Sequence, residues 1–276
     1  MLNTETVGFV GGGVMCEAIV ISLLKGAGMT ADRISISEPL ENRRRQLAER
    51  YGVVVSPNNA KVANRVDICI LSVKPQIMST ALAELRDVLK PSTLVISIAA
   101  GVTIASITQS LRDTQPIVRV MPNTPAQIGE GMSVWTANNS VTPLQKEQAQ
   151  TVLGAMGKEI QVDHEHYIDM ATAISGSGPA YVFLFMEAMI DAAVHLGFSR
   201  LVAQQLVEQT IKGSIDFAQQ AAKNPTELRN QVTSPGGTTA AALYEMEKGG
   251  LRTIISDAIW AAYKRAVELG SPKSTN

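Results

Sequence analysis

Short apolar runs rich in β-branched residues alternate with helix-like stretches through the first half of the chain, and this alternation constrains the fold most. Such runs are typical of strands that are buried on both faces of a sheet. Strands that alternate with helices form βαβ crossovers, which predict a parallel, doubly wound sheet. Strands are expected at 6–10, 33–37, 53–55, 67–73, 93–99 and 117–121, and helices at 14–25, 41–50, 75–89 and 103–112. The sequence therefore predicts an α/β domain over residues 1–163.

The strand pattern stops near residue 167, and the remaining sequence is typical of helices. These are expected at 179–197, 200–222, 225–233, 239–248 and 251–269. The first of them is apolar on nearly every side, because Glu187, Asp191 and His195 form one narrow polar stripe. An all-helical domain of roughly 110 residues cannot surround such a helix alone. We therefore predict that residues 164–276 form a helical dimerisation domain of an obligate homodimer.

Composition excludes several classes of protein. Apolar residues make up 45% of the chain, which is too many for a disordered protein. The 24 Lys and Arg residues nearly balance the 25 Asp and Glu residues, whereas a nucleic-acid binder is expected to carry a basic excess. Cys16 and Cys69 are too few for a disulfide framework or a cysteine-rich metal site. No signal-peptide pattern or long uncharged apolar run stands out, so we expect a cytoplasmic protein with no metal and no membrane partner.

A glycine-rich loop follows the first expected strand and opens the first expected helix. Gly11, Gly13 and the small Cys16 occupy the three positions of a dinucleotide-binding fingerprint. The first glycine permits a tight turn, the second lets the backbone approach a pyrophosphate, and the third small residue lets helix and strand pack closely. The helix N-terminus offers free N–H groups and a positive dipole end to the phosphates. This placement predicts a Rossmann-like domain that binds a nicotinamide dinucleotide.

The residues after the second expected strand leave the choice of dinucleotide open. Glu38 stands where an acidic residue accepts a hydrogen bond from the ribose 2′-OH of NAD, whereas Arg43, Arg44 and Arg45 are placed to favour the 2′-phosphate of NADP. Either Glu38 reads NAD, or it points away while Ser37 and an arginine bind the phosphate. The arginines also fit a solvated helix face. We expect NADPH in preference to NADH.

The segment 225–247, PTELRNQVTSPGGTTAAALYEME, resembles the signature of the pyrroline-5-carboxylate reductase family. Three further stretches are similar to the same family: VKPQ at 73–76, RVMPNTP at 119–125 and SGSGPAY at 175–181. With the glycine loop, they follow the family's order across almost the whole chain. The resemblance implies hydride transfer from NAD(P)H to the cyclic imine 1-pyrroline-5-carboxylate, which gives L-proline in the last step of proline biosynthesis.

The resemblance also implies roles for individual residues. The cofactor would contact Gly11, Gly12, Gly13, Val14, Met15, Ser37, Asn59, Val73, Lys74, Pro75, Ala99 and Ala100. The substrate would contact Ser234, Gly236, Gly237, Thr238 and Thr239, in a loop that the partner subunit helps to complete. Thr239 and Glu165 would be the catalytic residues, with Thr239 bonded to the ring nitrogen. Gln231 stands where some members carry Asn. Because the family often assembles dimers into rings, a homodecamer is a second expectation beside the homodimer.

The residues of the loop 234–239 agree with this assignment without requiring it. Two glycines followed by two threonines and a helix suit a nest of N–H donors for a carboxylate, although an ordinary turn with a Thr N-cap fits the same residues. Two other functions remain. One is an oxidoreductase of the β-hydroxyacid dehydrogenase type, for which Lys212 would be the catalytic lysine. The other is a nucleotide-sensing regulator without turnover.

Overall fold

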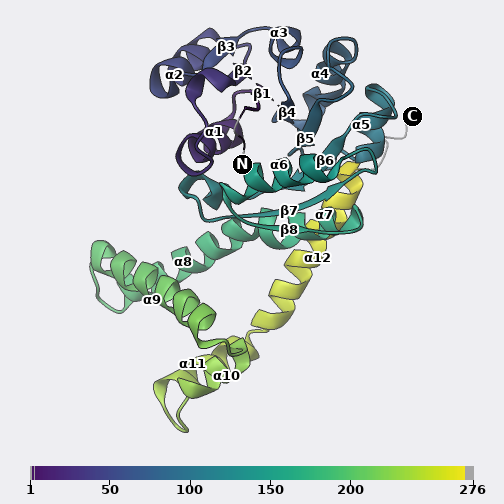
Figure 1. The fold of residues 1–276 in the computed structure, drawn as a ribbon. Coiled ribbons are helices and arrows are strands. Elements are labelled where there is room, and N and C mark those ends of the chain that lie inside the picture. Colours follow the sequence, from purple (N-terminus) through teal and green to yellow (C-terminus); the bar gives the residue numbers. More distant parts are fainter. Residues whose placement is uncertain (1, 3, 271–276) are drawn as a thin grey trace. The chain divides into compact units, whose positions relative to one another are not determined.

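An eight-stranded sheet forms the centre of the first part of the chain (Figure 1). The structure is a computed structural model that describes residue 2 and residues 4–270. The strands are β1 (Val7–Val10), β2 (Ile34–Ser37), β3 (Val54–Ser56), β4 (Ile68–Leu71), β5 (Leu94–Ser97), β6 (Ile117–Met121), β7 (Gly131–Ala137) and β8 (Gly157–Gln161). Their order is β3-β2-β1-β4-β5-β6-β7-β8, and β1 to β6 are parallel. This is the order of a Rossmann-like sheet, so the predicted fold class is confirmed.

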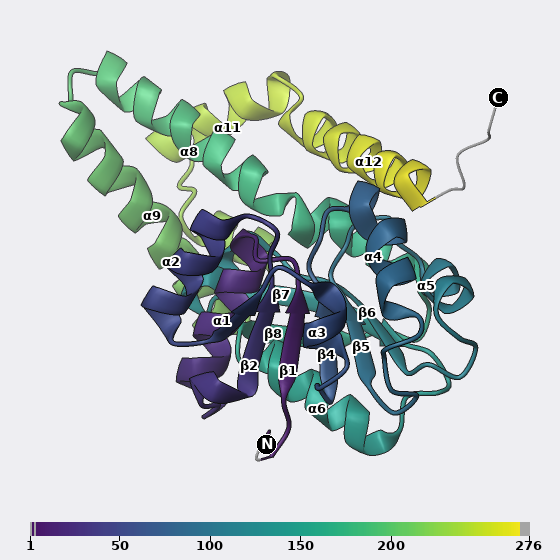
Figure 2. The same ribbon diagram turned by 90° about the horizontal axis from the view of Figure 1, so that it is seen from above.

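Helices cover both faces of this sheet, as the turned view shows (Figure 2). They are α1 (Val14–Gly26), α2 (Glu41–Tyr51), α3 (Asn59–Ala63), α4 (Met78–Leu85), α5 (Ile104–Ser110), α6 (Pro143–Gly154) and α7 (His166–Ala171). Phe9 and Ile36 belong to an apolar layer with residues of α1, α2 and α6. Val10 and Leu71 belong to a second layer with residues of α3, α4 and α5. Successive strand residues point to opposite faces, so strands that are apolar throughout hold both layers.

The sequence does not predict the last two strands of the sheet, β7 and β8. β7 is antiparallel to β6, and β8 pairs with β7 in parallel at the edge of the sheet. The β8 sequence, Gly-Lys-Glu-Ile-Gln, contains no apolar run, so pairing with β7 rather than intrinsic propensity makes it a strand.

The helix predicted at 75–89 is also wrong in length. It divides into a 3-10 turn at Pro75–Ile77 and the helix α4.

The chain packs as two compact units. Among the described residues, the first unit contains those up to 177 together with 262–270, and the second contains residues 178–261. The helices after the sheet are α8 (Gly178–His195), α9 (Arg200–Ala221), α10 (Pro225–Gln231), α11 (Thr238–Lys248) and α12 (Leu251–Gly270), as the sequence predicts to within a few residues. The compact units divide the chain after residue 177. The sequence predicts a domain boundary between residues 163 and 164, and this boundary stays a prediction.

The helices of the second unit expose large apolar side chains. No residue of α8 is buried, and Phe183 and Leu184 on this helix are 61% and 67% exposed. A pocket of about 480 Å³ between α8, α9 and α12 is lined almost wholly by apolar side chains. Among the described residues, one helical stretch, 166–195, is long and apolar enough to cross a membrane by length and composition. Surfaces of this kind require cover, either by another protein chain or by lipid.

Candidate functional site

The glycine loop lies at the point where the chain changes direction across the sheet. β1, which leads into the loop, has β2 on one side and β4 on the other. Ligands of doubly wound sheets bind outside the carboxyl ends of the strands at such a switch point. Gly13 is the N-cap of α1 and provides no capping side chain, so the first N–H groups of the helix remain for a ligand.

Each glycine of the loop meets a different environment. Gly11 has a φ of +104°, and a Cβ there would lie 2.9 Å from the Ser72 carbonyl oxygen. A Cβ at Gly12 would lie 2.9 Å from Leu47 Cδ1. At Gly13 a Cβ would meet no described atom within 4 Å. Gly11 is therefore required by its backbone conformation, and a Cβ at Gly12 would have to displace side-chain atoms, whereas Gly13 faces open space that a phosphate group can occupy.

The loop backbone is held by side chains from neighbouring elements. Glu38 Oε2 accepts a hydrogen bond from Gly12 N at 3.0 Å, and Arg43 Nε donates to Gly12 O at 2.8 Å. Ser72 Oγ donates to Gly11 O at 2.7 Å. Arg43 also donates to Glu17 Oε2 at 2.6 Å, which ties α2 to α1. The sequence offered no signal for the role of Ser72 beyond its place at the end of a strand.

Ser37 and Asn59 are brought together at the end of β2. Ser37 Oγ donates to Asn59 Oδ1 at 2.5 Å, and Asn59 Nδ2 donates to Glu84 Oε2 at 2.9 Å. Two residues predicted to contact the cofactor therefore meet, although they are 22 positions apart in sequence. Their place after the second strand is where a dinucleotide's adenosine ribose binds in this fold.

The remaining predicted cofactor residues follow β4 and β5, which are neighbours in the sheet. Lys74 is the N-cap of the turn Pro75–Ile77, and its carbonyl accepts from Ile77 N at 2.9 Å. Ala99 is buried and Ala100 is half-buried. Gly101 follows with a φ of +73°, and a Cβ there would lie 2.9 Å from the backbone of Leu269 in α12. The last turn of α12 therefore packs against the segment that follows β5.

Glu165 is part of an ion-pair network rather than a free carboxylate. The buried Arg119 on β6 donates to Glu165 Oε1 at 2.9 Å and to Asp169 Oδ1 at 2.6 Å. Glu165 Oε1 also accepts from Ile104 N, the first residue of α5, at 2.7 Å. These bonds give Glu165 a structural task at the start of α5, and its predicted catalytic role stays a prediction.

The predicted substrate loop belongs to the second unit. Gly236 has a φ of +71°, and Gly237 N donates to Ser234 O at 3.1 Å. Gly237 is the N-cap of α11, again without a capping side chain. The expected alternative, a Thr N-cap, is therefore wrong, because Thr238 is already the first helical residue. Helix N–H groups at Thr238 and Thr239 have no acceptor within the helix, and such groups bind carboxylates.

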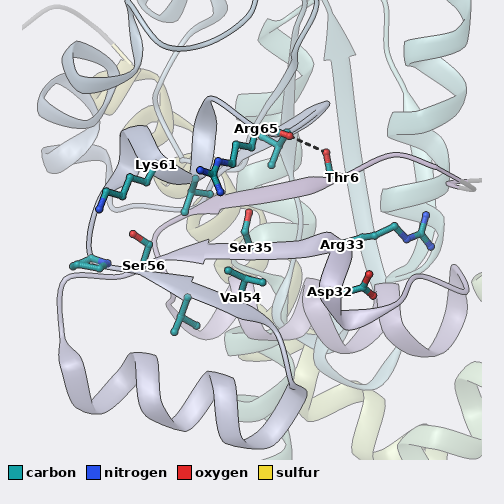
Figure 3. A pocket seen from close by; sticks show the side chains of 12 residues that line it. Thr6, Asp32, Arg33, Ser35, Val54, Ser56, Lys61 and Arg65 are labelled. Carbon is teal, nitrogen blue, oxygen red and sulfur yellow. Dashed lines mark hydrogen bonds between the residues drawn. The ribbon is translucent and has the colours of Figure 1, made fainter.

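A second pocket, of about 470 Å³, lies along β2 and β3 beside α3 (Figure 3). Lys61 and Arg65 line it together with the hydroxyls of Ser35 and Ser56. None of the residues predicted to bind cofactor or substrate lines this pocket. Among the residues that the structure describes, no group of three or more His, Cys, Asp and Glu side chains could hold a metal ion.

Comparison with known proteins decides the family. A relative from Synechocystis, a pyrroline-5-carboxylate reductase, is 41% identical, and the alignment covers 95% of this chain and 97% of the relative. The chain belongs to the pyrroline-5-carboxylate reductase family. Residues 165–269 match the family model of pyrroline-5-carboxylate reductase dimerisation, and residues 6–101 match that of the coenzyme F420-dependent NADP oxidoreductases.

Solved structures of pyrroline-5-carboxylate reductases agree over the whole chain. The enzyme from Coxiella burnetii has a TM-score of 0.90 at 38% identity, with 98% of this chain and 100% of that one covered. The Plasmodium falciparum enzyme, solved with NADP bound, has a TM-score of 0.90 at 32% identity and covers 97% and 99% of the two chains. The predicted family is therefore confirmed, and the glycine loop lies in the segment matched to NADP oxidoreductases.

Lys212, which the β-hydroxyacid dehydrogenase type would need as its catalytic lysine, lies on α9. Lys212 Nζ bonds Asp216 Oδ2 at 2.6 Å on the same helix face, and its side chain is 70% exposed.

Proposed function

We propose that this protein reduces 1-pyrroline-5-carboxylate to L-proline with a nicotinamide dinucleotide, the last step of proline biosynthesis. The full-length relation to pyrroline-5-carboxylate reductases is the observation that carries this proposal. Two helix N-termini support it, since each is preceded by glycines and each lacks a capping side chain. One suits the pyrophosphate of the cofactor, and the other suits the carboxylate of the substrate.

The residues of the glycine loop fit a dinucleotide. Gly13 faces open space, and the α1 N-terminus beyond it presents N–H groups and the positive end of a dipole. Val14 and Met15 are the first residues of this helix, so their N–H groups are the proposed donors. When bound, the nicotinamide supplies a hydride for the C=N carbon of the imine. The protein's part is to bind, orient and polarise.

We propose that the loop 234–239 holds the substrate. The backbone N–H groups of Thr238 and Thr239 would hold the substrate carboxylate, with Ser234, Gly236 and Gly237 shaping the loop. The Thr239 hydroxyl would donate to the ring nitrogen, where the product requires a proton. Since an imine can be protonated before attack, this hydroxyl assists the reaction without being its only proton source. Glu165 is proposed to lie near the ring.

NADPH is the proposed reductant. Glu38, the residue that would read NAD, has both carboxylate oxygens bonded to backbone N–H groups. Arg44 Nη1 donates to the carbonyl oxygens of Glu38 and Pro39 at 2.8 and 2.7 Å, which holds a guanidinium at the end of β2. A guanidinium has five N–H donors, so Arg44 keeps donors for a 2′-phosphate. Ser37, hydrogen-bonded to Asn59, is the second proposed contact.

The helical part of the chain is proposed to form a homodimer, which in turn assembles into a homodecamer. The dimerisation family model covers the exposed apolar helices, including the stretch 166–195. A second copy of the chain therefore provides the cover that these surfaces require, and we propose that the protein is cytoplasmic. Sedimentation of the purified protein tests the assembly, and a monomer at micromolar concentration would contradict it.

The direct test is an assay of NADPH and NADH oxidation with 1-pyrroline-5-carboxylate. We expect turnover with L-proline as the product and a higher kcat/KM with NADPH. Folded, dimeric protein that oxidises neither dinucleotide would contradict the proposed function. Turnover with NADH alone would leave the reaction in place and reject the proposed cofactor.

A further inference from the structure

Glu38 differs from a ribose-binding acid in where its carboxylate points. The residue follows β2 directly and is only 9% exposed. Oε2 accepts from Gly12 N at 3.0 Å, and Oε1 accepts from Leu40 N at 2.9 Å. Both oxygens are therefore bonded to backbone N–H groups of the protein. An acid that reads ribose uses these same oxygens to accept from ribose hydroxyls, whereas here each oxygen already accepts one bond from the protein and the residue is nearly buried.

Both backbone polar groups of Gly12 are hydrogen-bonded to side chains. Its N–H donates to Glu38, and its carbonyl accepts from Arg43 at 2.8 Å. The contact with Glu38 is close, since a Cβ at Gly12 would lie 3.0 Å from Glu38 Cβ. Two side chains, one from the segment that joins β2 to α2 and one from α2 itself, thus fix the middle residue of the loop. Loops fixed in this way bind with a smaller loss of conformational entropy.

Arg43 is itself fixed. Its Nη2 bonds Glu17 Oε2 at 2.6 Å, and Glu17 also bonds Arg50 and Tyr51. Glu17 lies in the first turn of α1, the helix that the loop opens. The chain of contacts therefore runs from α2 through Arg43 to both the loop and the helix start. The position of Gly12 relative to the α1 N-terminus is set by side chains rather than by the loop alone.

We propose that Glu38 is a positioning residue that presets the glycine loop for the pyrophosphate and does not read the ribose 2′-OH. This inference deepens the proposed function, because it rests on dinucleotide binding at the glycine loop. It makes the effect of Glu38 common to both dinucleotides, since NADH and NADPH carry the same pyrophosphate. Preference between them is then set by other residues.

The test compares Glu38→Gln with wild type in steady-state kinetics and in titrations with NADP⁺ and NAD⁺. An amide cannot accept at both positions, and hydrogen bonds to charged groups are worth about 10-fold or more in an equilibrium constant. We expect the KM and Kd of both dinucleotides to rise by similar factors of about 10, with kcat and the KM of the imine within about 2-fold of wild type. Loss of folded protein would instead lower kcat and leave KM unchanged.

The matched control is Glu41→Gln, which removes an exposed carboxylate at the start of α2 that pairs with Arg45 at 3.3 Å. It should leave both KM values unchanged. Arg43→Met provides a second route, because it releases Gly12 O rather than Gly12 N; it should raise both KM values together. This variant decides the matter if Glu38→Gln fails to fold.

Two results would overturn the inference. A rise confined to NADH would make Glu38 a ribose reader, and unchanged KM values in both variants would remove its role altogether. The titrations separate this inference from the proposed reaction. If wild type binds dinucleotides but does not reduce the imine, the reaction is wrong and the Kd values still test Glu38. If wild type binds neither dinucleotide, both proposals fall.

Discussion

The guanidinium of Arg119 and the carboxylate of Glu165 form a salt bridge of 2.9 Å in which the arginine is 1% exposed. Asp169 bonds the second guanidinium nitrogen, so one buried cation faces two carboxylates. Replacing this arginine with methionine leaves both acids without a counter-ion. We expect Arg119→Met to lower the free energy of unfolding by about 3 kcal/mol, measured by denaturant titration. Arg200→Met, which removes an exposed pair with Asp191, should cost less than about 1 kcal/mol.

Alanine substitutions at Gly11 and Gly13 should affect different properties: thermal stability in the first case and cofactor affinity in the second. Gly11→Ala is expected to lower thermal stability, because φ is +104° and the new Cβ would meet the Ser72 carbonyl. Gly13→Ala meets no described atom of the protein and should melt like wild type. It places a methyl group where the pyrophosphate is proposed to lie, so the Kd of NADP⁺ should rise at least 10-fold. Equal melting temperatures and equal Kd values in Gly13→Ala would contradict the proposed position.

Thr239→Ala tests the proposed hydroxyl at the ring nitrogen. We expect kcat to fall by less than about 10⁴-fold, the upper range of general acid–base assistance, because a protonated imine can still be reduced. Thr239→Ser should recover most of the rate. A fall larger than this limit would make Thr239 the obligatory acid. Thr238→Ala is the control, since it keeps the proposed backbone donor and removes only a neighbouring hydroxyl.

Arg44→Ala tests the proposed contact with the 2′-phosphate. We expect the KM of NADPH to rise about 10-fold while that of NADH changes little, since only NADPH carries this phosphate. Arg45→Ala is the control, because Arg45 is exposed and pairs with Glu41. Equal rises for both dinucleotides would assign Arg44 to holding the β2 terminus alone, through its bonds to Glu38 O and Pro39 O.

Glu17 should make stability depend on pH in the acid range. Burial raises the pKa of this carboxyl, but hydrogen bonds from Tyr51 and Arg43 outweigh burial and hold the pKa below its usual 4.5. The unfolded state therefore binds the proton more readily, and the stabilisation is present above pH 4.5 and is lost as the pH falls through the folded-state pKa. Glu17→Gln should be less stable than wild type near neutral pH, and the difference should shrink at about pH 3 in denaturant titrations.

The sequence predicts what its hydrophobic pattern encodes. Six strands, their alternation with helices and the change to an all-helical second half follow from apolar periodicity, and the structure confirms them. β8 has no such pattern, because Lys158 and Gln161 lie exposed at the sheet edge and only the pairing with β7 selects a strand. The sequence also does not determine where α4 begins. A proline followed by a helical pattern fits one long helix as well as a 3-10 turn at Pro75–Ile77 that precedes α4.

The candidate site is predictable where backbone geometry demands a residue type. Gly11 and Gly13 are found from their spacing, and Ser37 and Asn59 from the family resemblance. The direction of Glu38 cannot be predicted in this way. An acid after the second strand fits a ribose contact or a loop contact equally well, and only the position of Gly12 relative to β2 decides between them. Arg119 stands in a motif of the sequence, but the sequence does not show that it pairs with Glu165, the N-cap residue of α7, and with Asp169 on that helix.

The packing of Leu269 against Gly101 has a consequence for the order in which the protein can be completed during synthesis. The last turns of α12 belong to the same compact unit as the sheet, although residues 178–261 come between them in the chain. Domains generally fold as they leave the ribosome, with the N-terminal one first. In this chain the segment after β5 gains its final neighbour only when the last helix has emerged. Ribosome-bound chains that stop before residue 262 should therefore hold all eight strands but lack the contact of α12 with the segment after β5.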